Sequence, residues 1–372
     1  MKIRSAVLRR SGAEQPYAVS CPLEVTELEL APPGSSELMV RIRAAEVCHS
    51  DLSVVDGNRP RPLPTALGHE AAGEVVEIGP GVTDVAVGDH VVLTFMPSCG
   101  SCAHCERGRP ALRERGAAAN GAGDLLCGGR RLREPDGAPV THHLGVSAFS
   151  DHAVVDRSSA VVVPSAILFP TAALFGCAMV TGMGAVRNAA DVDRGDAVCV
   201  LGLGGGGLAA VLGAAVAGAG TIVVVDPVAE KRKLALELGA THACAPEDAE
   251  DAVAATSGGV RWAFEAAGVI PAMEQAFALL GRGGTAVSAG LPAPGLAMTL
   301  PALPFAGEGK GFLGSYMGSS QPQEDIPTMV ALWDRGLLPV EKLLSATTEL
   351  GQVNEAFDAL AEGTAVRKVI LP

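Results

Sequence analysis

Residues 197–226 read AVCVLGLGGGGLAAVLGAAVAGAGTIVVVD and decide the fold. The stretch divides into a β-branched run, a glycine cluster, an alanine-rich segment and a second β-branched run. Strand, turn, helix and strand in this order predict an α/β fold with a doubly wound parallel sheet. No charged residue occurs from Ala197 to Val225, so length alone would also allow a membrane span. Its eight glycines favour buried parallel strands, which helices cover on both faces.

The glycine cluster has the spacing of a dinucleotide-binding site. Gly202, Gly204 and Gly207 form G-x-G-x-x-G between the predicted strand and helix, the context in which this motif binds a pyrophosphate. Asp226 ends the second strand, where a carboxylate can bind the adenosine ribose hydroxyls and repel a 2′-phosphate. The pattern therefore predicts NAD rather than NADP. A flexible glycine loop and a helix-capping aspartate are the alternatives.

The chain on either side of this unit indicates two domains. Strand–helix alternation from about residue 195 predicts a Rossmann domain over 179–320. The first third carries strand-like runs between glycine- and proline-rich turns, which favours a partly open β-barrel. Residues 97–143 lack periodicity and predict a lobe with a long loop on that domain. Two amphipathic helices and a strand after residue 320 complete a barrel domain over 1–178 and 321–372.

The composition favours a soluble cytoplasmic enzyme. The 372 residues are 48% hydrophobic, enough for two cores. A net charge of −13 and 3% aromatic residues argue against a nucleic acid or an anionic membrane as partner. The N-terminal MKIRSAVLRRSG lacks the apolar core of a signal peptide. Nine cysteines, three of them in CGSCAHC (99–105), fit metal ligands in a reducing compartment better than disulfides.

Three short motifs upstream of the glycine cluster hold metal-ligand residues: CHSD (48–51), GHEAAGEVVEIGPGV (68–82) and GCAMVTG (176–182). Cys48, His69 and Cys177 would supply two thiolates and an imidazole, the ligand set of a catalytic zinc with an open fourth position. Zinc beside a nicotinamide predicts hydride transfer to or from an alcohol or aldehyde carbon. A buried cysteine and a turn histidine are the alternative interpretations.

These motifs resemble those of the zinc-dependent alcohol dehydrogenases of the medium-chain dehydrogenase/reductase family, over nearly the whole chain. Residues 68–82 match G-H-E-x-x-G-x5-G-x-x-V, the zinc signature of that family. The resemblance implies a GroES-like β-barrel catalytic domain beside the Rossmann domain, with the catalytic zinc on Cys48, His69 and Cys177. Glu70 would lie beside the metal and enter its shell during ligand exchange. Asp51 would accept the second imidazole N–H of His69 and fix its tautomer.

The resemblance also implies roles in binding cofactor and substrate. His49 and Arg367 match positions that hold the cofactor pyrophosphate. Ser50 matches the hydroxyl that hydrogen-bonds the reacting alcohol oxygen. Ser53 stands where some members have an outer histidine, and serine cannot act as a base near neutral pH. The proton relay must then end in water or another group, and Ser53 can equally be an ordinary helix-start residue.

A second departure lies in the cysteine-rich lobe. Cys99, Cys102 and Cys105 match the first three ligands of the family's structural zinc, but the fourth position is Arg113. A guanidinium cannot ligate zinc, and its charge opposes a nearby cation. We therefore expect a weaker site than the catalytic one.

Two arrangements of this lobe stay open. Three thiolates could hold zinc together with water, His104 or Cys127. Alternatively, the lobe has no metal, and Arg113 pairs with carboxylates such as Glu106.

The sequence thus predicts a zinc- and NAD-dependent alcohol dehydrogenase acting on a small alcohol or aldehyde. Residues 113–145 resemble the long loop of family members that tend to be dimers, so we expect a homodimer. GSYMGSSQP (314–322) and the missing outer base would also suit a biosynthetic aldehyde reductase or a thiol-adduct (formaldehyde-type) dehydrogenase. A non-catalytic relative of the same fold is a further alternative, although such relatives commonly lose the zinc ligands retained here.

Overall fold

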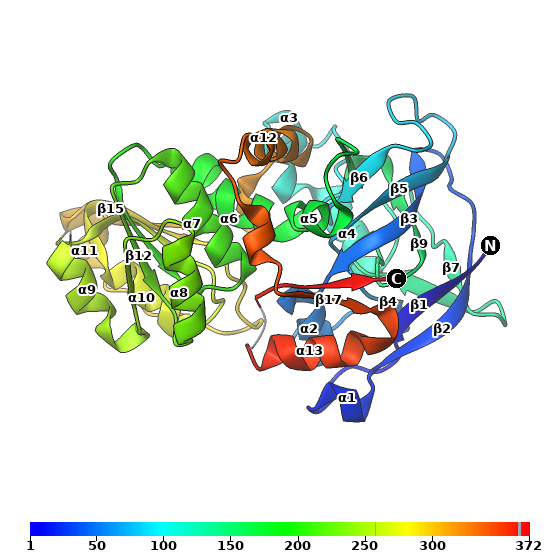
Figure 1. The fold of residues 1–372 in the computed structure, drawn as a ribbon, viewed down its shortest axis with the longest axis horizontal. Coiled ribbons are helices and arrows are strands. Elements are labelled where there is room, and N and C mark those ends of the chain that lie inside the picture. Colours follow the sequence, from blue (N-terminus) through cyan, green and yellow to red (C-terminus); the bar gives the residue numbers. More distant parts are fainter. Residues whose placement is uncertain (257, 364–365) are drawn as a thin grey trace. The chain divides into compact units, whose positions relative to one another are not determined.

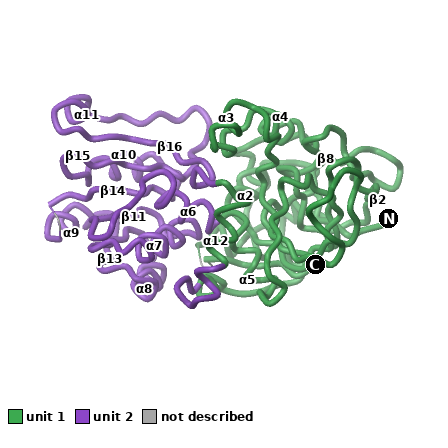
Figure 2. Tube along the Cα trace, turned by 90° about the horizontal axis from the view of Figure 1, so that it is seen from above, with its two compact units in different colours: residues 1–177, 321–330, 340–372 green, residues 178–320, 331–339 purple. Residues whose placement is uncertain are grey.

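The computed structural model describes residues 1–256, 258–363 and 366–372. In it the chain forms two compact units (Figure 2). The first comprises Met1–Cys177, Gln321–Val330 and Val340–Pro372, and the second Ala178–Ser320 and Ala331–Pro339. The domain limits expected from the sequence, 1–178 with 321–372 and 179–320, stay predictions.

The first unit is built on two sheets, where its β-branched runs and turns predicted a partly open β-barrel. One closes into a small barrel in the order β1 (Lys2–Leu8), β2 (Leu23–Leu30), β7 (Leu132–Arg133), β8 (Pro139–His142) and β4 (Thr65–Ala66). The other has the order β10 (Ala160–Val163), β6 (His90–Leu93), β5 (Ala71–Ile78), β3 (Glu37–Glu46), β18 (Lys368–Leu371) and β17 (Ala346–Glu349). Strand β9 (His152–Asp156) also pairs with β3.

Helix α13 (Val353–Ala361), labelled in Figure 1, belongs to this unit. Its apolar stripe packs on the core. Its buried side chains recur at helical spacing: Val353, Ala356, Phe357 and Leu360. The Phe357 ring makes an edge contact with Phe149, with centroids 6.1 Å apart. On its other side, Asp358 accepts the N–H groups at the start of α1 (Tyr17–Ser20), at 2.6 and 2.8 Å.

The cysteine-rich lobe differs from the predicted long loop. It contains α3 (Ala103–Glu106) and the nine-residue helix α4 (Glu114–Ala122). The sequence of α4, ERGAAANGA, has no amphipathic pattern, but its alanines have the highest intrinsic helix propensity. Gly123 ends the helix in a left-handed conformation at φ 72°.

The second unit confirms the Rossmann prediction. Its six-stranded parallel sheet has the order β13 (His242–Cys244), β12 (Thr221–Val225), β11 (Ala197–Leu201), β14 (Val260–Glu265), β15 (Leu280–Ser288) and β16 (Gly311–Gly314). The connecting helices are α7 (Gly205–Ala217), α8 (Ala229–Glu237), α9 (Ala249–Thr256), α10 (Ile270–Ala278) and α11 (Leu303–Gly307) (Figure 1). Helix α12 (Pro322–Asp334) follows the sheet in the chain. The uncharged stretch 197–225 is thus β11, α7 and β12.

One helical run of the described residues, Phe169–Ala190, is long and apolar enough to cross a membrane. It comprises α5 (Phe169–Ala173), the π-helical turn η3 (Phe175–Met179), α6 (Val180–Gly184) and a second π-helical turn, η4 (Ala185–Ala190). Because 83% of its apolar window is buried inside the protein, it resembles the core helix of a globular protein.

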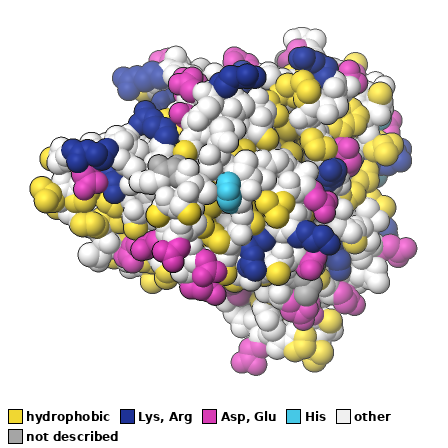
Figure 3. Space-filling view, turned by 60° about the vertical axis from the view of Figure 1, so that its left-hand side comes forward, with side chains coloured by type: hydrophobic (Ala, Val, Ile, Leu, Met, Phe, Trp, Pro, Cys, Tyr) yellow, Lys and Arg dark blue, Asp and Glu magenta, His cyan; other side chains and the backbone are white. Residues whose placement is uncertain are grey.

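Acidic and basic side chains are interspersed over the molecular face in Figure 3.

Candidate metal and cofactor sites

Cys48 and Asp51 are positioned by the start of helix α2 (His49–Val55). Cys48 is the extended N-cap residue, at φ −126° and ψ 153°. Its carbonyl oxygen accepts the N–H groups of Asp51 and Leu52 at 3.0 and 3.1 Å. These two bonds tie Cys48 to the first turn of the helix that carries Asp51.

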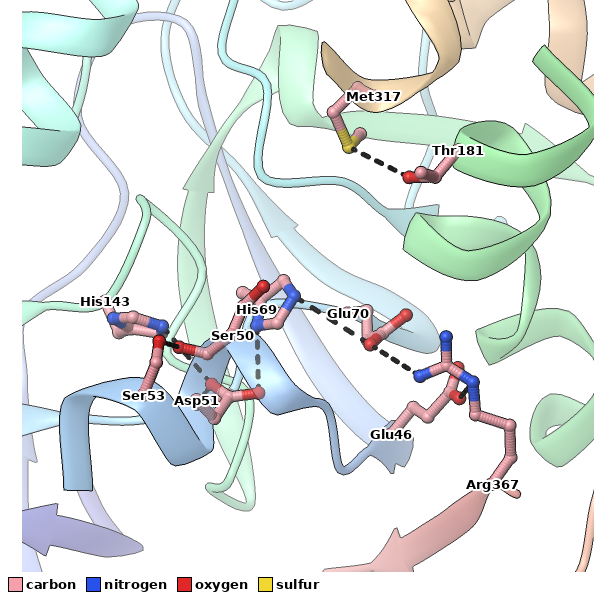
Figure 4. Close-up of polar contacts among 11 residues, drawn as sticks. Glu46, Ser50, Asp51, Ser53, His69, Glu70, His143, Thr181, Met317 and Arg367 are labelled. Carbon is pink, nitrogen blue, oxygen red and sulfur yellow. Dashed lines mark hydrogen bonds and ion pairs between the residues drawn. The ribbon is translucent and has the colours of Figure 1, made fainter. Parts of the chain in front are cut away.

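His69 is positioned by a tight turn between β4 and β5. Gly68 has φ +92°, and a Cβ there would press on the main chain of Phe149, so only glycine fits. The Gly68 N–H donates to Asp51 Oδ1 at 3.1 Å, and Asp51 Oδ2 lies 2.9 Å from His69 Nδ1 (Figure 4). This contact favours the tautomer with its proton on Nδ1 and directs Nε2 away from Asp51 as a potential metal ligand.

Cys177 lies in the π-helical turn η3. Such turns are rare and often occur at functional sites. Gly176 lets the turn approach β6, because a Cβ there would lie only 2.5 Å from the carbonyl oxygen of Leu93. The structure brings the ligand atoms of four buried residues within 4.8 Å of one another: Cys48, His69, Glu70 and Cys177.

A cation would compete with protons for the ligand atoms of this cluster. A hydrogen bond with Cys177, and the imidazole of His69, hold the pKa of Cys48 well below its ordinary value despite burial. The same thiol–thiol bond, with burial, raises the pKa of Cys177 well above its ordinary value. Burial lowers the pKa of His69, but Asp51 and Cys48 outweigh it and raise that pKa well above its ordinary value. A thiolate-binding cation would displace the protons of Cys177 and His69 Nε2.

Glu70 belongs to a buried charge network beside the cluster (Figure 4). Its Oε1 lies 3.8 Å from His69 Nε2 and 3.4 Å from Arg367 Nη1, and Arg367 Nε lies 2.6 Å from Glu46 Oε1. Burial raises the pKa of Glu46 to about 7 against the opposing effect of Arg367. Burial and the neighbouring Glu46 raise the pKa of Glu70 well above its ordinary value. When both carboxyls are ionised, the network carries a net negative charge that would favour a nearby cation.

Sequence reasoning missed Glu46 and His143. Glu46 ends β3 two residues before Cys48, and a carboxylate in the apolar run AAEV beside a predicted metal ligand was an available signal. His143 is 2% exposed, and its Nε2 lies 3.2 Å from Asp51 Oδ1. No spacing in the sequence linked His143 to Asp51, since only the fold brings residues 92 positions apart together.

The remaining predicted residues of α2 lie in its first turns. His49 is exposed and Ser50 is half-buried. Ser53 Oγ donates to the main-chain carbonyl oxygen of Ser50 at 2.9 Å, a common local bond of serine in helices (Figure 4). The roles of these residues, and the pyrophosphate contact of Arg367, stay predictions.

The thiols of Cys99, Cys102 and Cys105 form a second cluster within 4.8 Å of one another. Cys102 Sγ and Cys105 Sγ lie 3.5 Å apart. Main-chain N–H groups of Cys105 and Glu114 lower the pKa of Cys102 to about 6, whereas burial raises the pKa of Cys105. The lobe therefore keeps three sulfur donors together.

Arg113 extends into the protein, where it is 2% exposed. Its Nη2 donates to the carbonyl oxygen of Phe95 at 2.7 Å, and its Nη1 to that of Ala111 at 3.3 Å. The Cys127 thiol donates to Asp156 Oδ2 at 3.7 Å. Among the described residues, it does not belong to the group of thiols that lie within 4.8 Å of one another. His104 lies in α3. Zinc occupancy of the lobe stays a prediction.

In the second unit, each of the three glycines of the G-x-G-x-x-G motif suits its position for a different structural reason. Gly202 has φ +87°, which permits the turn after β11, and a Cβ on Gly207 would collide with the Gly202 carbonyl oxygen. Gly204 caps α7, and a Cβ there would meet no atom within 4 Å. The helix start therefore has open space above it, which suits an anion approaching the backbone.

Asp226 ties the end of β12 to this glycine turn. Its Oδ2 accepts the Leu203 N–H at 2.7 Å and its Oδ1 accepts the Val228 N–H at 2.8 Å. Each carboxylate oxygen has a further lone pair, so capping and ribose binding are compatible. Arg232 Nη1 donates to the main-chain carbonyl oxygen of Asp226 at 2.6 Å.

Known proteins share this architecture. The family model of the alcohol dehydrogenase GroES-like domain matches residues 34–165, and that of zinc-binding dehydrogenases matches residues 205–335. An NDMA-dependent alcohol dehydrogenase of Amycolatopsis methanolica is 37% identical over 100% of this chain and 99% of its own length. An S-(hydroxymethyl)glutathione dehydrogenase of Synechocystis is 35% identical over 97% and 99% of the two chains. The crystal structure of benzyl alcohol dehydrogenase from Acinetobacter calcoaceticus superposes with a TM-score of 0.92 at 32% identity, covering 100% and 99% of the chains.

Proposed function

Because the chain belongs to the zinc-dependent alcohol dehydrogenases of the medium-chain dehydrogenase/reductase family, we propose that Cys48, His69 and Cys177 hold its catalytic zinc. The protein is an oxidoreductase that transfers a hydride between a nicotinamide dinucleotide and an alcohol or aldehyde. The observation that carries the zinc assignment is the buried convergence of two thiols and one imidazole within 4.8 Å. This donor set leaves a fourth position for substrate.

Zinc in this position supplies a Lewis acid that lowers the pKa of an alcohol or polarises an aldehyde carbonyl. The surrounding side chains prepare that chemistry. Asp51 keeps the proton of His69 on Nδ1. The Ser50 hydroxyl would accept the proton of the substrate hydroxyl while donating its own proton onward, to water or another group. Glu70, 3.8 Å from His69 Nε2, is close enough to exchange with a ligand of the metal. Ser53 does not serve as the terminal base, because a serine hydroxyl is not basic near neutral pH.

For the cofactor we propose NAD. Gly202, Gly204 and Gly207 shape the pyrophosphate site, and Asp226 accepts hydrogen bonds from the ribose with its remaining lone pairs. His49 and Arg367 are proposed pyrophosphate contacts. Equal turnover with NADP and NAD would contradict the role given to Asp226.

We further propose a cytoplasmic homodimer that has no nucleic acid or membrane partner. Strand β16 ends the six-stranded sheet and carries the exposed Leu313. Leu303 and Phe305, which precede β16 in the chain, are also exposed. A second copy would cover such apolar side chains beside an edge strand. The net charge of −13 supports the proposal that nucleic acids and membranes are not partners. The free thiols support the proposed cytoplasmic location.

The substrate is proposed to be a small alcohol or aldehyde. A thiol-adduct alcohol is the second candidate, favoured by the similarity to the Synechocystis S-(hydroxymethyl)glutathione dehydrogenase. Turnover of primary, secondary, aryl and thiol-adduct alcohols, with NAD, NADP and NDMA as acceptors, would rank these classes.

The zinc assignment is tested by Cys177→Ala. Loss of the Lewis acid should reduce kcat at least a thousandfold, since it stabilises the transition state by several kcal/mol. NADH binding, followed by its fluorescence, should stay within about twofold of wild type. Cys244→Ala, a half-buried cysteine of β13, is the matched control and should keep full turnover and zinc content. A Cys177→Ala protein with more than a tenth of the wild-type rate would contradict the assignment.

A further inference from the structure

His143 shares the carboxylate of Asp51 with the proposed zinc ligand His69 (Figure 4). Its Nε2 lies 3.2 Å from Asp51 Oδ1, while His69 Nδ1 lies 2.9 Å from Oδ2. The two imidazole rings meet edge to face, with centroids 5.8 Å apart. Asp51 is therefore held between two histidines, one of which has no role in the function described above.

The backbone around His143 fixes the position of the ring. Its N–H donates to Ser147 Oγ at 3.0 Å, and its carbonyl oxygen accepts the Val146 N–H at 3.1 Å. Leu144 and Ser147 adopt left-handed conformations, at φ 52° and 57°. Non-glycine residues occupy this region only where the surrounding structure determines it, so the turn after His143 is a rigid support.

Asp51 depends on its donors because it is fully buried. Its Oδ1 receives the Gly68 N–H at 3.1 Å as well as lying beside His143. Without His143, the buried carboxylate would lose one of the three polar groups that lie within 3.2 Å of its oxygens, and no solvent is at hand to replace it. The carboxylate could then rotate about its Cβ–Cγ bond and loosen its hold on His69.

We propose that His143 is a positioning residue of the zinc site and acts through Asp51 on His69. It donates its Nε2–H to Asp51 Oδ1 and thereby keeps Oδ2 directed at His69 Nδ1. The inference rests on the zinc assignment made above. Loss of such outer hydrogen bonds typically costs 10–100-fold in metal affinity or activity.

Two substitutions separate the hydrogen bond from ring packing. His143→Phe keeps a ring against His69 and removes the N–H, whereas His143→Gln keeps an N–H near the Nε2 position and removes the ring. The rate of zinc release to a chelating dye is measured for each variant. The kinetic phase of release that belongs to the catalytic zinc is identified as the one that is missing from Cys177→Ala. We expect His143→Phe to release this zinc 10–100-fold faster and to lose a similar factor in kcat, with KM for NAD unchanged.

In His143→Gln, both release rate and kcat should stay within about threefold of wild type. His142→Phe is the control for His143→Phe. His142 Nε2 accepts the Arg131 N–H at 3.0 Å, so removing this acceptor should affect thermal stability but not zinc release. Unchanged zinc release in His143→Phe, or equal losses in the Phe and Gln variants, would overturn the role of His143. If wild type and Cys177→Ala released zinc with the same kinetic phases, the zinc assignment itself would instead be overturned.

Discussion

Glu46 is a carboxylate whose charge the protein interior opposes, because burial raises its pKa to about 7. It is fully buried, and Arg367 Nε at 2.6 Å is its ion-pair partner. Breaking such a buried pair from one side costs about 3–5 kcal/mol, and Arg367 would then keep only Glu70, at 3.4 Å, as its carboxylate partner among the contacts described above. We expect Glu46→Ala to lower the free energy of unfolding by this amount in urea titrations, and to weaken zinc binding by removing negative charge beside Glu70.

The control for Glu46 is Glu37, another fully buried carboxylate, whose Oε2 accepts Arg131 Nε–H at 2.7 Å. Glu37→Ala should cost comparable stability while zinc affinity stays at the wild-type value. If both variants lost zinc equally, Glu46 would have only a general folding role.

Ser50 and Ser53 separate the proposed proton path from helix structure. Ser50→Ala should lower kcat for alcohol oxidation by about 100-fold or more, because positioned proton transfer contributes about 10²–10⁴-fold. Ser53→Ala should change kcat less than about threefold, since its hydroxyl already bonds the Ser50 carbonyl oxygen at 2.9 Å. Steady-state rates with NAD and one alcohol decide this, and large equal losses would place Ser53 in the relay.

At the scale of elements, the turn into α7 distinguishes a glycine needed for folding from one needed for the cofactor. A Cβ at position 207 collides with the Gly202 carbonyl oxygen, whereas one at 204 meets no atom within 4 Å. Gly207→Ala should therefore lower the melting temperature by several degrees. Gly204→Ala should melt as the wild type does but bind NADH at least tenfold more weakly, because the methyl group occupies the open space over the helix start. If Gly204→Ala and wild type bound NADH with equal affinity, the proposal that the pyrophosphate binds at this turn would be contradicted.

The cysteine-rich lobe is an element with three sulfur donors and no fourth cysteine. Arg113 donates to the Phe95 and Ala111 carbonyl oxygens, and a guanidinium cannot ligate zinc. We expect metal analysis to give close to one zinc per wild-type chain and Arg113→Cys to raise this towards two. Cys102→Ser should leave the wild-type content unchanged. Two zinc ions that resist a chelator in the wild type would show that another group completes the site.

Across the whole molecule, sequence reasoning predicted what depends on local periodicity and missed what depends on distant contacts. Strand–helix alternation predicted the Rossmann sheet, and β-branched runs between turns predicted the barrel. Helix α4 was missed because its ERGAAANGA sequence has no apolar stripe to reveal it. Glu46 and His143 were missed because their partners, Arg367 and Asp51, lie 321 and 92 positions away.

The C-terminal strand has a consequence for synthesis of the chain. β18 pairs with β3, joining Val369 to Glu46, and it follows Arg367 directly. β18, and the guanidinium beside Glu70, are therefore synthesised after every other strand of the first unit. Most of the second unit is one continuous segment, Ala178–Ser320, and is available earlier. Vectorial folding should thus complete the nucleotide-binding fold first. The nascent metal-ligand unit meanwhile keeps an open sheet edge and depends on protection from aggregation until β18 has left the ribosome.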